Sequence, residues 1–229
     1  MDGNGFWNGI KSGAPIGLGY FPIAVAFGAL AVKAGLIWWE AALMSVLVYA
    51  GASQFVGVSM LMTGSGLLQI VIATLILNLR HLVMSLSVNY RMRFFPPLGR
   101  RVLSLGITDE TFALLTLGGG KQDQKALDPW FTAGLMAAAY AGWVTGTAAG
   151  ALGAGWIPEG ITTAITVGLY ALFIGLLIPA VRRQRGPAVT AAAGMALSTL
   201  FGLVVGSGWA IVLAALAASG LGMLFWEKG

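Results

Sequence analysis

One apolar stretch, from Leu67 to Tyr90, constrains the fold of this chain more than any other part of its sequence. At about 1.5 Å per residue, a helix of that length crosses the bilayer's hydrocarbon core of about 30 Å. Near its middle the stretch carries Asn78, Arg80 and His81. An arginine on a lipid-spanning helix costs at least ~2.5–3.5 kcal/mol, so it must face protein, water or an opposite charge. The stretch therefore predicts a membrane-spanning helix with a functional polar face.

Polar side chains form a stripe along this predicted helix. The stripe recurs at intervals of four, three and four residues and consists of Thr74, Asn78, His81 and Ser85. That spacing puts its members on one helical face, with Arg80 beside them, and favours a pathway or a binding site. Two structural alternatives stay open. Arg80 could reach the cytoplasmic headgroups, although it lies ~15 Å from the end of the stretch, and Asn78 and His81 could merely link two helices by hydrogen bonds.

The composition is that of a membrane protein. Hydrophobic residues make up 58% of the chain and charged residues 9%, against roughly 25% charge in soluble domains, which predicts an all-α polytopic integral membrane protein. The net charge of +5 comes from basic residues at the ends of apolar spans, where they fix orientation, so no nucleic-acid partner is expected. With no cysteine and a single histidine, we expect no disulfide, no metal site and no cofactor. Residues 1–12 lack the pattern of a removable signal peptide.

Six or seven long apolar spans can be read from the sequence, at 13–33, 37–62, 66–90, 128–150, 161–181, 188–206 and 208–226. Arginines cluster at 91–101 and again at 182–185, and both groups should face the cytoplasm. The preferred arrangement has seven crossings, with the amino end outside and the carboxyl end in the cytoplasm. A re-entrant hairpin at 37–62 would instead give six crossings and a cytoplasmic amino end.

A shorter segment at 105–118 is predicted to be a partial or re-entrant helix. It begins at Thr108-Asp109-Glu110, where the threonine would cap the helix and both carboxylates would lie in the first turn, favoured by the helix dipole. Non-helical backbone at such a place requires protein or a water-filled cavity around it. An ordinary capped helix at the membrane surface is an equally open interpretation.

Two of the spans carry residues that predict interruptions. Pro15 and Pro22 lie in the first span, and Gly51, Ser53 and Gln54 lie in the second. Interrupted spans point to the substrate site of a transporter, because freed backbone groups and helix ends can bind a ligand. Each break alone could be a simple kink.

The chain is predicted to be a single transmembrane transporter domain over residues 1–229. Its possible inverted halves are 13–90 and 128–206, with 91–127 as a cytoplasmic connector that contains the partial helix. Small residues recur every four positions from Gly134 to Gly150 and again from Gly194 to Gly206, a spacing that lets helix backbones approach closely. We expect the Gly142-Gly146-Gly150 part of the first ladder to offer a face to a partner subunit.

A series of motifs identifies the family that this chain resembles. In order, they are Gly19-Tyr20-Phe21-Pro22, Ala26-Phe27-Gly28, Met44-Ser45, Ala50-Gly51-Ala52-Ser53-Gln54-Phe55, Asn78-Leu79-Arg80-His81 and Thr108-Asp109-Glu110-Thr111-Phe112. Together they resemble the AzlC family over roughly the first half of the chain, and length and hydropathy agree through the rest. The resemblance implies the large subunit of a bacterial branched-chain amino acid exporter that acts with a small AzlD-like membrane subunit.

The expected function is therefore secondary export of valine, leucine and isoleucine, with methionine as a further candidate, across the bacterial inner membrane. The expected substrate and proton pathway consists of Tyr20, Pro22, Ser53, Gln54, Asn78, Arg80, His81, Thr108, Asp109 and Glu110. Arg80 could bind the substrate carboxylate and an acidic residue its ammonium, while His81 could carry a proton in an antiport cycle. Alternatively, Arg80 could pair with Asp109 or Glu110 as a gate. A channel for small solutes and a non-transporting scaffold are the rival functions, and no motif indicates an enzyme.

Overall fold

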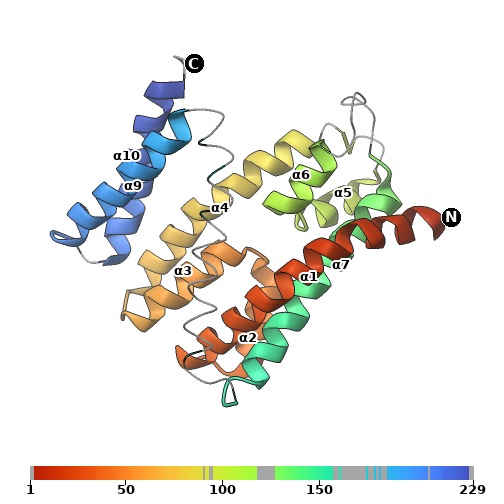
Figure 1. Cartoon of the computed structure of the whole chain (residues 1–229), viewed down its shortest axis with the longest axis horizontal. Helices are drawn as coiled ribbons and strands as arrows, with labels where there is room; N and C mark the ends of the chain where they lie inside the picture. The colour runs from red at the N-terminus through yellow and green to blue at the C-terminus, as the bar shows by residue number, and fades with distance from the viewer. Residues whose placement is uncertain are drawn as a thin grey trace. The chain divides into compact units, whose positions relative to one another are not determined.

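The structure is a computed structural model that describes residues 3–89, 91–92, 95–117, 127–156, 160, 174, 178, 181, 185–205 and 207–226. Within these residues the chain is all-α, as predicted, and forms nine helices (Figure 1). The chain divides into two compact units. The first comprises Met1–Gln54 and Asn78–Pro158, and the second comprises Phe55–Leu77 and Glu159–Gly229. The predicted inverted repeat of 13–90 and 128–206 stays a prediction.

The helices follow the predicted apolar spans closely. They are α1 (Gly3–Lys33), α2 (Trp38–Val48), α3 (Gly51–Met62), α4 (Leu67–Asn89), α5 (Pro97–Ser104), α6 (Asp109–Leu117), α7 (Pro129–Leu152), α9 (Arg185–Gly202) and α10 (Ser207–Trp226). Two of them, at Asn4–Lys33 and Leu67–Asn89, are long and apolar enough to cross a membrane. The span predicted at 161–181 lies almost wholly outside the described residues, and the number of crossings stays a prediction.

The first span is not interrupted, so that prediction was wrong. Pro15 and Pro22 lie inside one continuous helix, α1. A proline removes one helical hydrogen bond, but neighbouring structure can compensate for the loss in a membrane helix. Helix α7 packs along α1 over most of its length and supports the helix beside both prolines (Figure 1).

Glycines on both helices create the close packing of α1 against α7. A Cβ atom built on Gly150 of α7 would lie 2.0 Å from the carbonyl oxygen of Val25, and one on Gly142 would lie 2.3 Å from that of Gly17. On α1, a Cβ atom at Gly9 would lie 2.1 Å from the carbonyl oxygen of Phe131. No side chain fits at such distances, so the two backbones touch directly. The Gly142-Gly146-Gly150 ladder is thus occupied within the chain, and the prediction that it faces a partner was wrong.

The second predicted interruption is present, but it lies slightly earlier than the sequence indicated. Helix α2 ends at Val48 and α3 begins at Gly51, so the break falls at Tyr49 and Ala50. Tyr49 adopts a left-handed backbone conformation with φ of 40°, which is unusual for a bulky residue. The break therefore comes from a strained tyrosine rather than from the glycine.

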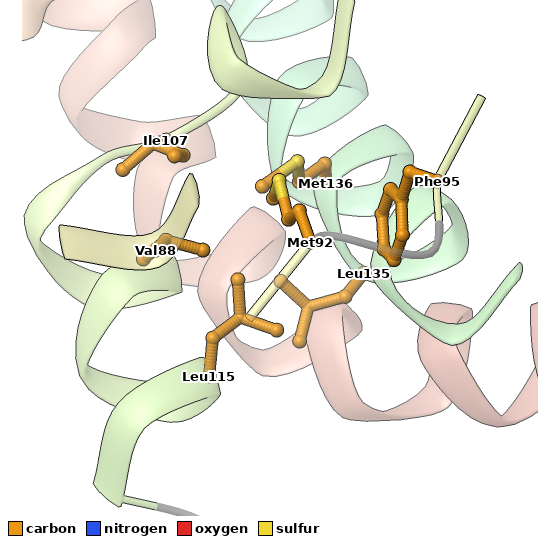
Figure 2. Close-up of a cluster of buried hydrophobic side chains, with 7 residues drawn as sticks. All are labelled: Val88, Met92, Phe95, Ile107, Leu115, Leu135 and Met136. Atoms are coloured by element: carbon orange, nitrogen blue, oxygen red, sulfur yellow. The ribbon is translucent and has the colours of Figure 1, made fainter. Parts of the chain in front are cut away.

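Each unit has an apolar core. In the first unit, Figure 2 shows Leu115 of α6, Leu135 and Met136 of α7, and Met92 of the turn after α4 close together, and Val88, Phe95 and Ile107 complete this buried cluster. In the second unit, Met60 and Ala73 are buried between α3 and α4, with Trp209 of α10 packed against them. The first core fixes α6 against α7 and so positions the start of α6.

The predicted partial helix at 105–118 is present as α6, and a separate helix precedes it. That helix, α5, lies inside the region predicted to be a connector, and Pro97 occupies its first turn. Proline is favoured there because the first helical residues have no intrahelical use for their N–H groups. Pro97 is therefore the local sequence signal for the start of α5.

Candidate functional site

The start of α6 is organised by two threonines. The backbone N–H of Thr111 donates to Thr108 Oγ1 (3.3 Å), and the backbone N–H of Thr108 donates to Thr111 Oγ1 (2.8 Å). This reciprocal pairing confirms the predicted cap and has the logic of a capping box. Both threonines are buried. As predicted, Asp109 and Glu110 lie in the first turn, where the positive end of the helix dipole stabilises their charges.

Arg80 reaches this first turn from α4. Its Nη1 lies 2.6 Å from Asp109 Oδ2, a charge-assisted hydrogen bond. The two side chains keep 42% and 35% of their surface exposed. Arg80 has five N–H donors, and this ion pair uses one of them. The pair thus has room to accept further ligands.

Tyr20 connects α1 to the same turn. Its hydroxyl lies 2.8 Å from Thr108 Oγ1 and is hydrogen-bonded to Glu110 Oε2. A carboxylate can only accept a hydrogen bond, so the Tyr20 hydroxyl is the donor to Glu110. Three helices therefore contribute to one arrangement, which we call the charged cluster and which consists of Tyr20, Arg80, Thr108, Asp109 and Glu110.

The remaining polar residues of the α4 stripe differ in how they are satisfied. Thr74 donates to the carbonyl oxygen of Ile70 (2.8 Å) on its own helix. Asn78 Oδ1 and His81 Nδ1 are buried atoms without a hydrogen-bond partner among the described residues. His81 is close enough to Asp109 and Glu110 to interact with them electrostatically. The middle of the stripe therefore adjoins the charged cluster and still has unused hydrogen-bonding capacity.

Ser53 and Gln54 belong to a second arrangement, at the break between α2 and α3. Gln54 Nε2 donates to Ser45 Oγ (2.9 Å), and Gln54 Oε1 accepts from Trp143 Nε1 (2.9 Å). Ser45 Oγ and Thr147 Oγ1 lie 2.8 Å apart. These four residues form what we call the amide cluster, Ser45, Gln54, Trp143 and Thr147, and each is at least 96% buried. Ser53 instead donates to the carbonyl oxygen of Ala50 (2.9 Å) and so stabilises the break.

Trp143 links the two clusters and was missed by the sequence analysis. Its ring meets that of Tyr20 edge to face, with centroids 5.8 Å apart, while its indole N–H donates a hydrogen bond to Gln54 Oε1. A signal was available, because a tryptophan inside a glycine ladder is buried and its N–H then needs an acceptor. Pro22, by contrast, is exposed on α1 and has no hydrogen bond to either cluster in the described structure.

The charged cluster contains the groups that a small charged ligand requires. No group of three or more histidine or acidic residues that could hold a metal ion occurs among the described residues. Arg80 pairs with Asp109 while Tyr20 donates to Glu110, so the cluster contains both cationic donors and anionic acceptors. Such a set complements a ligand that carries a positive and a negative group.

Comparisons with known proteins identify the family. The family model described as AzlC protein matches residues 15–157, which extends beyond the motifs read from the sequence. The inner membrane protein YgaZ of Escherichia coli is 33% identical over 97% of this chain and 92% of its own length. An uncharacterized membrane protein of Archaeoglobus fulgidus is 32% identical over 93% of this chain and 91% of its own length. No solved structure matches. This chain therefore belongs to the AzlC family of membrane proteins.

Proposed function

We propose that this chain is the large subunit of a secondary exporter for branched-chain amino acids in the bacterial inner membrane. Its substrates would be valine, leucine and isoleucine, with methionine as a further candidate. Membership of the AzlC family supports this proposal, and the Escherichia coli relative, an inner membrane protein by name, matches almost the whole chain. No Walker motif is present in the sequence, so the energy for transport would come from an ion gradient.

The charged cluster is the observation that carries this proposal. A free amino acid is a zwitterion, so its binding site needs a donor for a carboxylate and an acceptor for an ammonium group. Arg80 supplies a planar guanidinium that suits a carboxylate, and Asp109 and Glu110 supply acceptors within the same turn. The cluster holds one positive and two negative side chains, so it offers partners of opposite charge to both ends of a zwitterion.

The exposure of the Arg80–Asp109 pair supports a site that opens onto water or a partner. Both charged side chains are more than one third exposed, Arg80 at 42% and Asp109 at 35%. Charges in the membrane are too costly to face hydrocarbon, so a water-filled pathway, a substrate or another subunit must cover them. We propose that the small AzlD-like subunit closes this side. The glycine ladder of α7 gives this part of the proposal no support, because α1 already occupies it.

Exchange of partners gives a simple transport step. The substrate carboxylate would displace Asp109 from Arg80, and the substrate ammonium would then bind the released Asp109 or Glu110. His81 lies within electrostatic reach of both carboxylates and would carry a proton in the opposite direction. On this mechanism the ion pair closes the empty site, so the gating and binding interpretations of Arg80 describe two states of one cycle.

The proposed orientation places the arginine-rich segments in the cytoplasm. Arg91 Nη1 donates to the carbonyl oxygen of Leu115 at the end of α6 (2.7 Å), so the carboxyl end of α6 would lie near the cytoplasmic surface. A cysteine placed at Gly99 in α5 should resist an impermeant thiol reagent in intact cells and react after permeabilisation. Equal reaction in both conditions would overturn this orientation.

The function is tested by efflux of labelled leucine from vesicles that contain this chain, with and without its small partner. We expect efflux well above that of empty vesicles, and a dependence of its rate on an imposed pH gradient. Dipeptides that contain leucine should also be more toxic to cells that lack the chain. Absence of leucine, valine and isoleucine efflux in both vesicle preparations would contradict the proposed function.

A further inference from the structure

A cavity in the first unit lies beside the α2–α3 break and is not used by either polar cluster. It is open on one side, has a volume of about 350 Å³ and is bounded by the end of α2, the end of α5 and the first half of α7. Its wall is mainly aliphatic and includes Val46, Val48, Leu103, Met136 and Ala137. Ligand pockets in proteins span about 300–1,000 Å³, so this cavity suits one small apolar group.

Among the described residues that line the cavity, Tyr49 has a buried side-chain hydroxyl without a partner. The residue is 5% exposed, and its hydroxyl oxygen has no hydrogen-bond partner among the described residues. Buried hydroxyls are usually paired, so an unpaired one points to a ligand. The other tyrosine of the wall, Tyr140, is paired, because it donates to the carbonyl oxygen of Val46 (2.8 Å).

Packing holds Tyr49 in this position in spite of its backbone strain. Its ring meets that of Tyr140 edge to face, with centroids 4.9 Å apart and planes at 70°. Its φ of 40° is uncommon for a residue with a large side chain. Strained conformations of this kind occur mainly at binding sites and switch regions, where neighbouring contacts enforce them.

The cavity and the charged cluster are neighbours in the chain and in space. Gly106 lines the cavity and lies two residues before Thr108, and its carbonyl oxygen accepts from Thr111 Oγ1 (3.3 Å). Tyr49 is also close enough to Glu110 to interact with it electrostatically. A small molecule could therefore occupy the cavity with one end and reach the acidic turn with the other.

We propose that this cavity binds the aliphatic side chain of the exported amino acid, and that the unpaired Tyr49 hydroxyl at its edge hydrogen-bonds the polar end of the same molecule. The assignment rests on the proposed function and specifies where its selectivity arises. The occupant is a single free amino acid because the wall is apolar, the volume is small and the polar edge leads to groups that complement a zwitterion. A lipid chain and a helix of the partner subunit are the competing occupants.

Substitution of Ala137 by leucine tests the assignment, because it fills the cavity from α7. We expect Ala137→Leu to lower leucine and isoleucine efflux at least about tenfold and valine efflux clearly less, since valine is smaller. The matched control is Ala149→Leu, also at an exposed position on α7 but outside the cavity. It should leave the leucine-to-valine ratio unchanged. Leu103→Ala should shift preference toward larger substrates such as phenylalanine.

Tyr49→Phe provides the second test, because it keeps the ring and removes only the unpaired hydroxyl. We expect a higher KM for leucine at an unchanged melting temperature. If the wild type exports leucine but Ala137→Leu and Ala149→Leu give the same ratio of leucine to valine, the cavity assignment is wrong and the proposed function stands. The assignment is also overturned if Ala137→Leu loses a bound lipid or the small subunit while the ratio of leucine to valine efflux stays the same. If the wild type exports none of these amino acids, the proposed function itself fails.

Discussion

The two polar clusters of the first unit differ in how completely they are closed. The amide cluster is at least 96% buried, and the side chain of Gln54 has both a donor and an acceptor partner. The charged cluster leaves Arg80 and Asp109 partly exposed and adjoins unpaired atoms of Asn78 and His81. A fully satisfied network stabilises a unique packing, whereas an open one can exchange its partners. We propose that the amide cluster serves the fold and that the charged cluster serves ligand binding.

Both clusters depend on the close packing of α1 and α7, so breaking this packing should have the largest effect. A Cβ atom at Gly150 would lie 2.0 Å from the carbonyl oxygen of Val25, and backbone cannot move as a flexible side chain can. Gly150→Leu should therefore reduce the yield of monodisperse protein at least about tenfold in size-exclusion chromatography. Gly202→Leu is the control, because a Cβ atom there meets nothing within 4 Å. Similar yields for the two variants would refute the packing argument.

Arg80→Ala should have the next largest effect, and it should act on transport rather than on folding. Hydrogen bonds to charged groups contribute about 1.5–3 kcal/mol, which corresponds to a loss of about 10- to 100-fold in leucine efflux. Exposed ion pairs contribute only about 0–1 kcal/mol to stability, so the melting temperature should change little. Arg80→Lys keeps the charge but loses the planar fork and should retain an intermediate rate. An Arg80→Ala variant that exports at the wild-type rate would exclude Arg80 from the site.

The contrast between the clusters explains what could be predicted from the sequence. The helices α1, α4, α7, α9 and α10 were predicted because hydropathy marks apolar spans directly. The cap and the acidic first turn of α6 were predicted because both are local features. The pairing of Arg80 with Asp109 was left open between two carboxylates, since residue order alone does not decide contacts between helices.

Other features depend on tertiary contacts and were not accessible to sequence reasoning. The prolines of α1 do not interrupt it, because the interface with α7 holds the helix on both sides of them. The break after α2 occurs at Tyr49, a residue type that gives no local signal for a left-handed conformation. The contact of Tyr20 with Glu110 joins residues 90 positions apart. No local pattern in the chain marks such a pair.

Gln54→Ala should affect stability rather than transport. The substitution leaves the indole N–H of Trp143 without a partner, and Ser45 keeps only its contact with Thr147. An orphaned buried group costs about 1–3 kcal/mol, and the melting temperature should fall by about 2–4 °C for each kcal/mol. Gln69→Ala is the matched control, because that glutamine makes an exposed contact with the backbone of Gly66 (3.1 Å). Equal melting temperatures for the two variants would contradict the assignment of Gln54 to the fold.

Tyr20→Phe tests whether the two clusters communicate. It removes the hydroxyl shared by Thr108 and Glu110 and keeps the ring against Trp143. A typical hydrogen bond contributes about 0.5–1.5 kcal/mol, so leucine efflux should fall about 2- to 10-fold. The amide cluster keeps all its hydrogen bonds, so the melting temperature should drop by less than in Gln54→Ala. A larger drop would mean that Tyr20 belongs to the fold rather than to the site.

His81→Gln should have the smallest effect on the maximal rate. Glutamine keeps hydrogen-bonding capacity but does not titrate, so efflux should become less dependent on pH between 5 and 8, where histidine changes its charge. Leucine binding should be nearly unchanged, as measured by protection against heating. An unaltered pH profile would exclude His81 as the proton carrier and leave the binding site in place.

The most direct test of the division between the clusters measures the melting temperature and the leucine efflux per folded molecule in Arg80→Ala and Gln54→Ala side by side. We expect Arg80→Ala to melt within about 2 °C of the wild type, since its exposed ion pair contributes little, and to lose at least nine tenths of its efflux. We expect Gln54→Ala to melt at a clearly lower temperature and, below that temperature, to export leucine at the wild-type rate. If both variants lose stability and efflux together, or if the two effects are exchanged, the charged cluster is not a distinct transport site.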